Sequence, residues 1–133
     1  MKKQMLISAL IVLALIQILS SCSTKNDVPQ VMCTEEFRTV SLTVTGDSLT
    51  SFYTVRESTS DTIRYQGYNL YSLSNTYPVL DDSYRSMIFN REERFTFIGL
   101  LNKAIVVNEP FVIGADECHI YKVSGKEEVI IGK

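Results

Sequence analysis

The sequence has no tryptophan, one histidine and three prolines among its 133 residues. A nucleophile–histidine–acid arrangement would have to use that single histidine, His119, and no Gly-x-Ser-x-Gly elbow accompanies it. The pairs of adjacent acidic residues lack the across-the-cleft spacing that a glycosidase needs. We therefore expect no catalytic residue in this chain.

Metal-binding patterns are equally scarce. Cys118 and His119 are adjacent, and neighbouring residues of a strand point to opposite faces, so we expect His119 to face outward and no zinc site to form. Asp81-Asp82-Ser83 offers oxygen ligands for calcium, but no Asp-x-Asp-x-Asp-Gly pattern is present, which favours a plain turn. We expect no metal and no cofactor.

The one long apolar run lies at the N-terminus. Residues 1–4 form a short basic segment, and residues 5–19 are apolar except for Ser8 and Gln17. This length suits the h-region of a signal peptide but falls short of the about 20 residues that span a bilayer. The pattern predicts an exported chain.

The apolar run ends at Leu19-Ser20-Ser21-Cys22, which resembles the lipobox of bacterial lipoproteins. The resemblance implies that residues 1–21 are removed and that Cys22 carries the diacylglycerol and acyl chains, such as palmitate, that hold the protein at a membrane. Ser23 after the cysteine resembles the pattern of lipoproteins forwarded to the outer membrane. Whether the domain faces the periplasm or the cell surface stays open.

The predicted mature chain is mildly acidic. Removal of Lys2 and Lys3 leaves eleven basic side chains against fifteen acidic ones, a net charge of −4. Without a basic patch, nucleic acid is not an expected partner. Residues 22–32 are polar and include Pro29, which is typical of a tether, and residues 33–133 have the length of one domain.

Two cysteines remain after Cys22 is lipidated. Because an exported chain meets an oxidising compartment, we predict a disulfide between Cys33 and Cys118, which would close most of the domain into one loop. Two buried reduced thiols are the alternative. The residues alone favour the disulfide without settling the choice.

Apolar and polar residues alternate along much of the mature chain. Val40, Leu42 and Val44 alternate with threonines and a serine, which is typical of a half-buried strand. No stretch of ten or more residues shows a helical stripe. We expect an all-β fold, a single immunoglobulin-like or transthyretin-like β-sandwich of about seven to nine strands. The predicted strands cover residues 37–45, 49–56, 62–66, 68–73, 77–80, 95–101, 104–107, 111–115, 118–123 and 128–131, with another starting at 85–89.

Turn residues separate these strands. Pro78 has no N–H to donate, so its strand should be an edge strand or begin there. Residues 90–93 are expected at a hairpin tip, and residues 108–110 between two strands. Binding specificity is expected in loops at the ends of the sandwich, residues 57–62, 74–76, 81–85 and 90–94.

Both ends of the domain resemble a known group. Cys33-Thr34-Glu35-Glu36-Phe37 and residues 111–125 are similar to the opening and closing segments of small lipoproteins of bacteroidete-type bacteria, which are related to carboxypeptidase regulatory-like domains. Residues 46–110 add only the β pattern, and the Thr-Asp-x-x-Gly pattern common in regulatory-like domains is missing. The resemblance implies a transthyretin-type sandwich without catalytic residues.

A second resemblance concerns modification. Asp47-Ser48-Leu49 and Asp61-Thr62-Ile63 are similar to the Asp-Ser/Thr-aliphatic sites that such bacteria O-glycosylate on exported proteins. Both lie near predicted turns, where an enzyme can reach them. Ser48 and Thr62 are therefore predicted O-glycosylation sites, and no Asn-x-Ser/Thr sequon is present.

Tyr65, Tyr68 and Tyr71 recur at every third residue around Gly67. If exposed, their rings could stack on sugars; otherwise they belong to the core or its rim. Together these features predict a non-enzymatic cell-envelope lipoprotein that binds a glycan or assembles with an envelope protein. The alternative is an inhibitor or regulator of an envelope or host enzyme, with one rigid loop acting as a plug.

Overall fold

The computed structural model describes residues 31–66, 71 and 74–132. The chain divides into two units, Met1–Val31 and Met32–Lys133, and the second contains every strand described below. The predicted lipidation site Cys22 and the predicted sugar-stacking residue Tyr68 lie outside the described residues.

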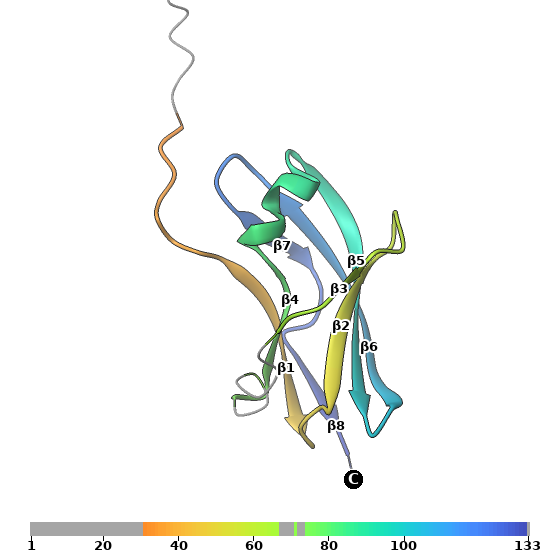
Figure 1. Cartoon of the computed structure of the whole chain (residues 1–133). Helices are drawn as coiled ribbons and strands as arrows, with labels where there is room; N and C mark the ends of the chain where they lie inside the picture. The colour runs from red at the N-terminus through yellow and green to blue at the C-terminus, as the bar shows by residue number, and fades with distance from the viewer. Residues whose placement is uncertain (1–30, 67–70, 72–73, 133) are drawn as a thin grey trace, which may run out of the picture. The chain divides into compact units, whose positions relative to one another are not determined.

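Eight strands and one 3-10 helix form the described part of this unit. They are β1 (Thr39–Gly46), β2 (Ser51–Arg56), β3 (Thr62–Ile63), β4 (Thr76–Asp81), η1 (Asp82–Ile88), β5 (Arg91–Leu101), β6 (Ala104–Ala115), β7 (Ile120–Ser124) and β8 (Glu128–Ile131). One sheet has the order β4-β1-β8 and the other β3-β2-β5-β6-β7, and the two face each other (Figure 1). The predicted all-β sandwich is confirmed.

Strand β1 follows the alternation expected from its sequence. Val40, Leu42 and Val44 are buried, whereas the residues between them lie toward solvent. β1 pairs antiparallel with β4 and parallel with β8, but β8 covers only residues 43–46 of β1. The first half of β1 therefore has a neighbouring strand on one side only.

The chain changes sheets between β7 and β8. β7 belongs to the five-stranded sheet, and four residues later β8 belongs to the three-stranded one. Gly125 makes this crossing with φ of 133°, and a Cβ there would lie 2.2 Å from the ring of Phe111. A side chain at this position would meet both backbone strain and a clash with the core.

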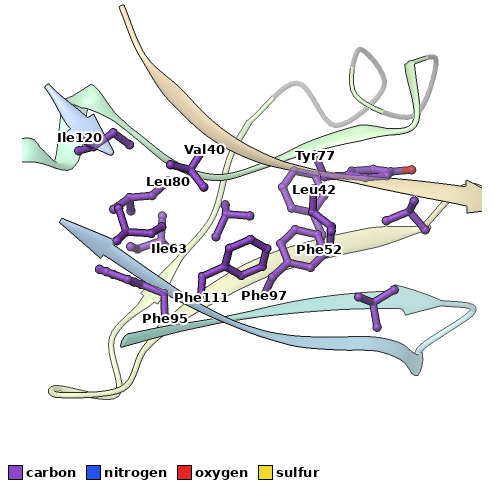
Figure 2. Close-up of a cluster of buried hydrophobic side chains, with 14 of the residues drawn as sticks. Val40, Leu42, Phe52, Ile63, Tyr77, Leu80, Phe95, Phe97, Phe111 and Ile120 are labelled. Atoms are coloured by element: carbon purple, nitrogen blue, oxygen red, sulfur yellow. The ribbon is translucent and has the colours of Figure 1, made fainter. Parts of the chain in front are cut away.

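The centre of the sandwich is aromatic (Figure 2). The ring centroid of Phe52 lies 5.2 Å from that of Tyr77 and 5.8 Å from that of Phe97, and Phe111 is also fully buried. The buried Thr54 hydroxyl donates to the carbonyl of Val79 at 2.8 Å, which joins β2 of one sheet to β4 of the other. Packing and this hydrogen bond hold the sheets together here.

Residues 104–115 form one strand, so the predicted break at residues 108–110 is wrong. Pro110 is tolerated because of where its nitrogen points. Asn90 N donates to Ala115 O, on the side of β6 that faces β5. Backbone groups alternate along a strand, so those of Pro110 face the other side, where β7 pairs only with residues 112–115. No hydrogen bond is lost. Pro78 lies in β4, an edge strand of its sheet, as predicted.

The predicted hairpin tip at residues 90–93 is also wrong, since β5 begins at Arg91. The polar side chains there are held on the sheet: the Arg56 guanidinium donates two hydrogen bonds, both 2.6 Å long, to the Glu93 carboxylate. The predicted strand start at residues 85–89 is instead the end of η1 and Phe89, and β3 is shorter than predicted. Of the predicted strand 68–73, only Tyr71 is described.

Candidate functional site

The carboxylate of Asp82 joins three segments of the chain at one end of the sandwich. Its Oδ2 accepts from the backbone N–H of Arg38 at 2.8 Å, and its Oδ1 accepts from the N–H of Ile120 at 2.8 Å. Arg38 immediately precedes β1 and Ile120 begins β7, so one side chain connects strands of both sheets. The backbone N–H of Asp82 also donates to the carbonyl of Arg38 at 3.0 Å.

Asp82 is positioned by the start of η1. Asp81 is the N-cap residue, and its side chain accepts from Ser83 N at 2.9 Å. The predicted turn at residues 81–83 therefore exists, but it begins a helix and directs Asp82 into the domain. A carboxylate suits the N-cap position of Asp81 because the first N–H groups of a helix have no partner within the helix.

His119 lies against Asp82 and is 7% exposed. Its Nδ1 is 2.8 Å from Asp82 Oδ2 and its Nε2 is 3.0 Å from the hydroxyl of Thr34. The prediction that His119 faces outward is wrong. Strand alternation does not apply to it, because β7 begins at Ile120 and His119 belongs to the preceding turn.

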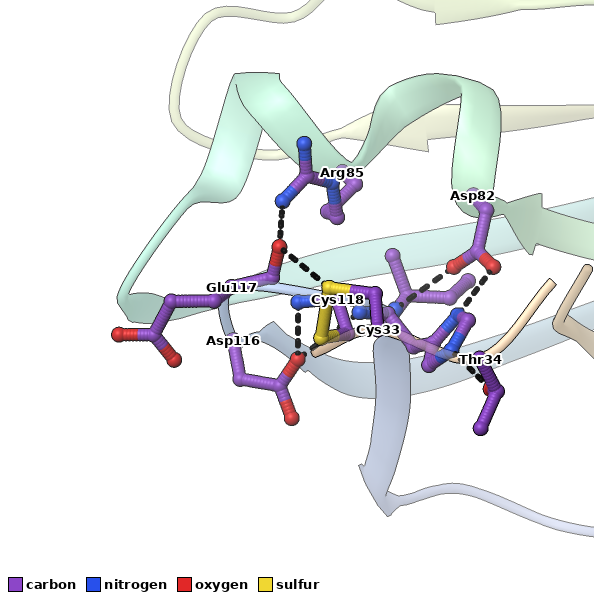
Figure 3. Close-up of a disulfide and its surroundings, with 9 residues drawn as sticks. Cys33, Thr34, Asp82, Arg85, Asp116, Glu117 and Cys118 are labelled. Atoms are coloured by element: carbon purple, nitrogen blue, oxygen red, sulfur yellow. Dashed lines mark hydrogen bonds and ion pairs between the residues drawn. A yellow bond between two sulfur atoms is a disulfide. The ribbon is translucent and has the colours of Figure 1, made fainter. Parts of the chain in front are cut away.

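The disulfide predicted between Cys33 and Cys118 is confirmed, with an S–S distance of 2.07 Å and Cα atoms 5.2 Å apart (Figure 3). It joins the segment before β1 to the turn before β7. Asp116 Oδ1 holds this turn by accepting from the N–H groups of Cys118 at 2.7 Å and His119 at 2.8 Å, and Arg85 donates to the carbonyl of Glu117. We call Thr34, Asp82, Asp116, His119 and this disulfide the polar end.

Both carboxylates of the polar end favour the ionised state. Burial raises the pKa of Asp82, but hydrogen bonds from the N–H groups of Arg38 and Ile120 and from His119 outweigh it and lower the pKa overall. Hydrogen bonds from the N–H groups of His119 and Cys118 lower the pKa of Asp116. Both groups are therefore negatively charged at neutral pH.

Thr34, His119 and Asp82 stand in the order of a nucleophile, a base and an acid. The same contacts join segments of the chain: Thr34 precedes β1, Asp82 follows β4 and His119 precedes β7. Both oxygens of Asp82 accept from backbone N–H groups, so the arrangement is a polar clamp between these segments. The described residues also contain no group of three or more histidine, cysteine or acidic side chains that could hold a metal ion.

A groove of about 460 Å³ lies beside the polar end. Residues 36–41 form one wall, residues 120–122 form the other, and Glu127 closes the far end. Phe37 is 63% exposed at its rim, whereas Val40 and Ile120 are buried below. The ring of Tyr121 lies over Gly114 of β6, so this residue contributes its backbone to the groove. The groove therefore has a mainly polar lining over the core and one exposed aromatic side chain at its rim.

The charges of the groove neutralise each other. Arg38 pairs with Glu36 at 3.3 Å, and Lys122 pairs with Glu127 across the end of the groove. Two acids and two bases line it, so no net charge remains to attract a strongly charged ligand.

The tyrosines predicted to stack on sugars contact the core. Tyr65 stacks on Phe52 with a centroid distance of 6.3 Å, and Tyr71 meets the same ring edge-on at 5.7 Å. Burial raises the pKa of the Tyr65 hydroxyl. Both rings are explained by packing around Phe52, and Tyr68 lies outside the described residues. Glycan binding by these residues stays a prediction.

The two predicted O-glycosylation sites are exposed. Ser48 lies in the turn between β1 and β2, and its hydroxyl donates to Asn75 Oδ1 at 2.9 Å. Thr62 is the first residue of β3. Their accessibility is compatible with modification, which stays a prediction.

Sequence reasoning missed the two most organised features of this end. Asp82 was assigned only to a turn, because its partners Arg38 and Ile120 are 44 and 38 residues away. The groove was missed because it exists only where β8 does not pair with β1, and the sequence does not show that β8 pairs with residues 43–46 alone. The one usable signal was the pair of cysteines, which places residues next to Cys33 beside those next to Cys118.

The chain matches no protein-family model, no curated protein and no solved structure. The resemblance to bacteroidete-type lipoproteins is therefore a prediction from the residues. Within the described ranges, no helix has the length and apolar character needed to cross a membrane.

Proposed function

We propose that this chain is a non-enzymatic lipoprotein of the bacterial cell envelope, anchored in the outer membrane through Cys22, and that its domain binds another envelope protein. The observation that carries this proposal is the groove between residues 36–41 and 120–122. A concave site with an exposed aromatic side chain at its rim, here Phe37, is typical of protein-binding surfaces.

The envelope location is supported by two features. The signal segment and lipobox occur in the order and spacing of lipoproteins. The Cys33–Cys118 disulfide fits an oxidising compartment, since disulfides rarely persist in a reducing cytosol. Labelling with radioactive palmitate should mark the chain and be lost in Cys22→Ala.

A binding role is favoured over catalysis by the bonding of the polar end. His119 is 7% exposed, and the carboxylate of Asp82 accepts from backbone N–H groups that belong to segments of both sheets. These contacts support a structural role for the two side chains at one end of the groove.

Site-specific photocrosslinking in intact cells tests this function. A photoreactive phenylalanine at position 37 should give a crosslinked product, whereas the same group at position 105 should not. Ile105 is the matched control because it is 58% exposed, close to the 63% of Phe37, but lies outside the groove. Equal products from both positions, or none from position 37, would contradict the proposal.

A further inference from the structure

The two walls of the groove are strand edges without a neighbour. On one side, β8 covers residues 43–46 of β1 and leaves Thr39 and Ser41 uncovered. On the other side, β7 pairs with β6 on one edge, and its opposite edge ends the five-stranded sheet. Unpaired strand edges are templates for another strand.

Three hydrogen bonds show which backbone groups of β1 face the groove. Arg38 N donates to the Asp82 side chain and Val44 N to Asn75 O, both toward the β4 side. Thr43 N donates in the other direction, to Glu127 O at 2.9 Å. Because backbone groups alternate along a strand, those of Thr39 and Ser41 point to the same side as Thr43, into the groove.

The same reasoning applies to β7. The carbonyl of His119 accepts from Asp116 N on the β6 side, whereas Ile120 N points away from β6 and donates to Asp82. Lys122 has the direction of Ile120, so its N–H and carbonyl face the groove from the opposite wall. The groove thus presents backbone donors and acceptors from both sides.

These walls suit an extended peptide better than a small polar ligand. A strand laid between them can use its own N–H and C=O groups with both edges, as in β-strand addition. The paired charges of the groove favour a segment without net charge. Proline at a paired position would be excluded, since it has no N–H.

We propose that the groove binds an extended, uncharged peptide segment of a partner protein by β-strand addition to Thr39, Ser41 and Lys122. This inference rests on the proposed function and specifies how the partner is held. The polar end keeps the two edges apart and in register, because Asp82 holds Arg38 and Ile120 at a common distance from one carboxylate.

Proline variants test the inference in cells that carry the photoreactive group at position 37. Thr39→Pro removes an N–H that faces the groove, at the first residue of β1, where proline is tolerated. Asn108→Pro is the matched control, because Asn108 has the direction of Pro110 and its N–H faces the edge of β6 that β7 leaves uncovered. We expect about a tenfold loss of crosslinked product for Thr39→Pro, from the lost ladder bond and distorted edge, and little change for Asn108→Pro.

The outcomes separate the two proposals. If Thr39→Pro keeps the product, the partner uses this face without strand addition, so the inference fails and the proposed function stands. A product of twice the mass of the chain overturns the inference in favour of a second copy as the occupant. Loss of product in both proline variants also overturns it, because the effect would not be specific to the groove.

A peptide titration tests strand addition directly on the purified chain, in addition to the cellular crosslink. The probe is the capped pentapeptide acetyl-Thr-Val-Thr-Val-Thr-amide, added to the full chain in detergent micelles and followed by amide NMR. Binding should shift the amides of Thr39, Ser41 and Lys122 and slow their hydrogen exchange, and N-methylation of alternate residues should abolish both effects. Unchanged amides, or equal binding of the methylated peptide, would overturn strand addition.

Discussion

The sheets of this sandwich are joined in two different ways. In the aromatic centre, formed by Phe52, Tyr77, Phe97 and Phe111, they are joined by buried rings from several strands. At the polar end they are joined by one disulfide and by the hydrogen bonds of one carboxylate. In the aromatic centre the contribution to stability is spread over many contacts. At the polar end it is concentrated in Asp82 and two cysteines.

The difference follows from how each interaction depends on geometry. Dispersion and apolar burial are nearly non-directional, so neighbouring rings can adjust when one changes. Hydrogen bonds to Asp82 need its oxygens within about 3 Å of defined N–H groups, so they also set the spacing of the strands. The groove lies beside the polar end, where hydrogen bonds fix the positions of the strands.

The largest expected effect comes from removing the disulfide. Replacing Cys33 and Cys118 by alanine should lower the free energy of unfolding by about 4–5 kcal/mol, because the bond closes a loop of 85 residues in the unfolded chain. Urea unfolding followed by circular dichroism would measure it. Phe97→Leu, a modest change in the aromatic centre, is the contrast, with an expected loss of about 1 kcal/mol. A larger loss for Phe97→Leu than for the loss of the disulfide would mean that the aromatic centre depends more on a single residue than the polar end does.

A smaller effect is expected when Asp82 loses its charge. Asp82→Asn should cost about 2–3 kcal/mol, since the amide cannot accept from Arg38, Ile120 and His119 as the carboxylate does. Asp81→Asn is the matched control: asparagine caps helices as well as aspartate does, so its unfolding midpoint should hardly move. Equal losses for the two variants would mean that Asp82 acts only as part of the turn.

The smallest effect is a dependence on acid. The folded-state pKa values of Asp82 and Asp116 lie below the ordinary 3.8. Each ionised carboxylate therefore stabilises the fold above pH 3.8, and this contribution is lost as the pH falls through the folded-state pKa. Glu93, held by Arg56, adds to this, with a pKa lowered from 4.5 to about 2. Wild-type stability should therefore fall between about pH 4.5 and pH 2.

The Asp82→Asn variant sharpens this measurement. Its stability should fall less steeply over the same pH range, because one titrating group is gone, whereas Phe97→Leu should keep the wild-type slope. Thermal unfolding at half-unit steps of pH would show the two slopes. Identical slopes for wild type and Asp82→Asn would show that the acid loss comes from Glu93 and Asp116.

Several parts of the fold were predictable because their cause is local. Alternation at Val40, Leu42 and Val44 identified β1, since period-two burial is a property of any half-buried strand. Two cysteines after a predicted signal segment favoured the disulfide that the structure contains. The break predicted at Pro110 failed, because the cost of proline in a strand depends on which edge its nitrogen faces, and that is not written in the neighbouring residues.

The composition and order of residues were sufficient for the fold class and favoured the disulfide, because burial pattern and redox pairing need no knowledge of distant contacts. The partners of Asp82, the burial of His119 and the open edges of β1 and β7 came from folding alone. The contacts of Asp82 and His119 arise where segments more than 35 residues apart meet, and the open edge of β1 depends on the register at which β8 stops covering it.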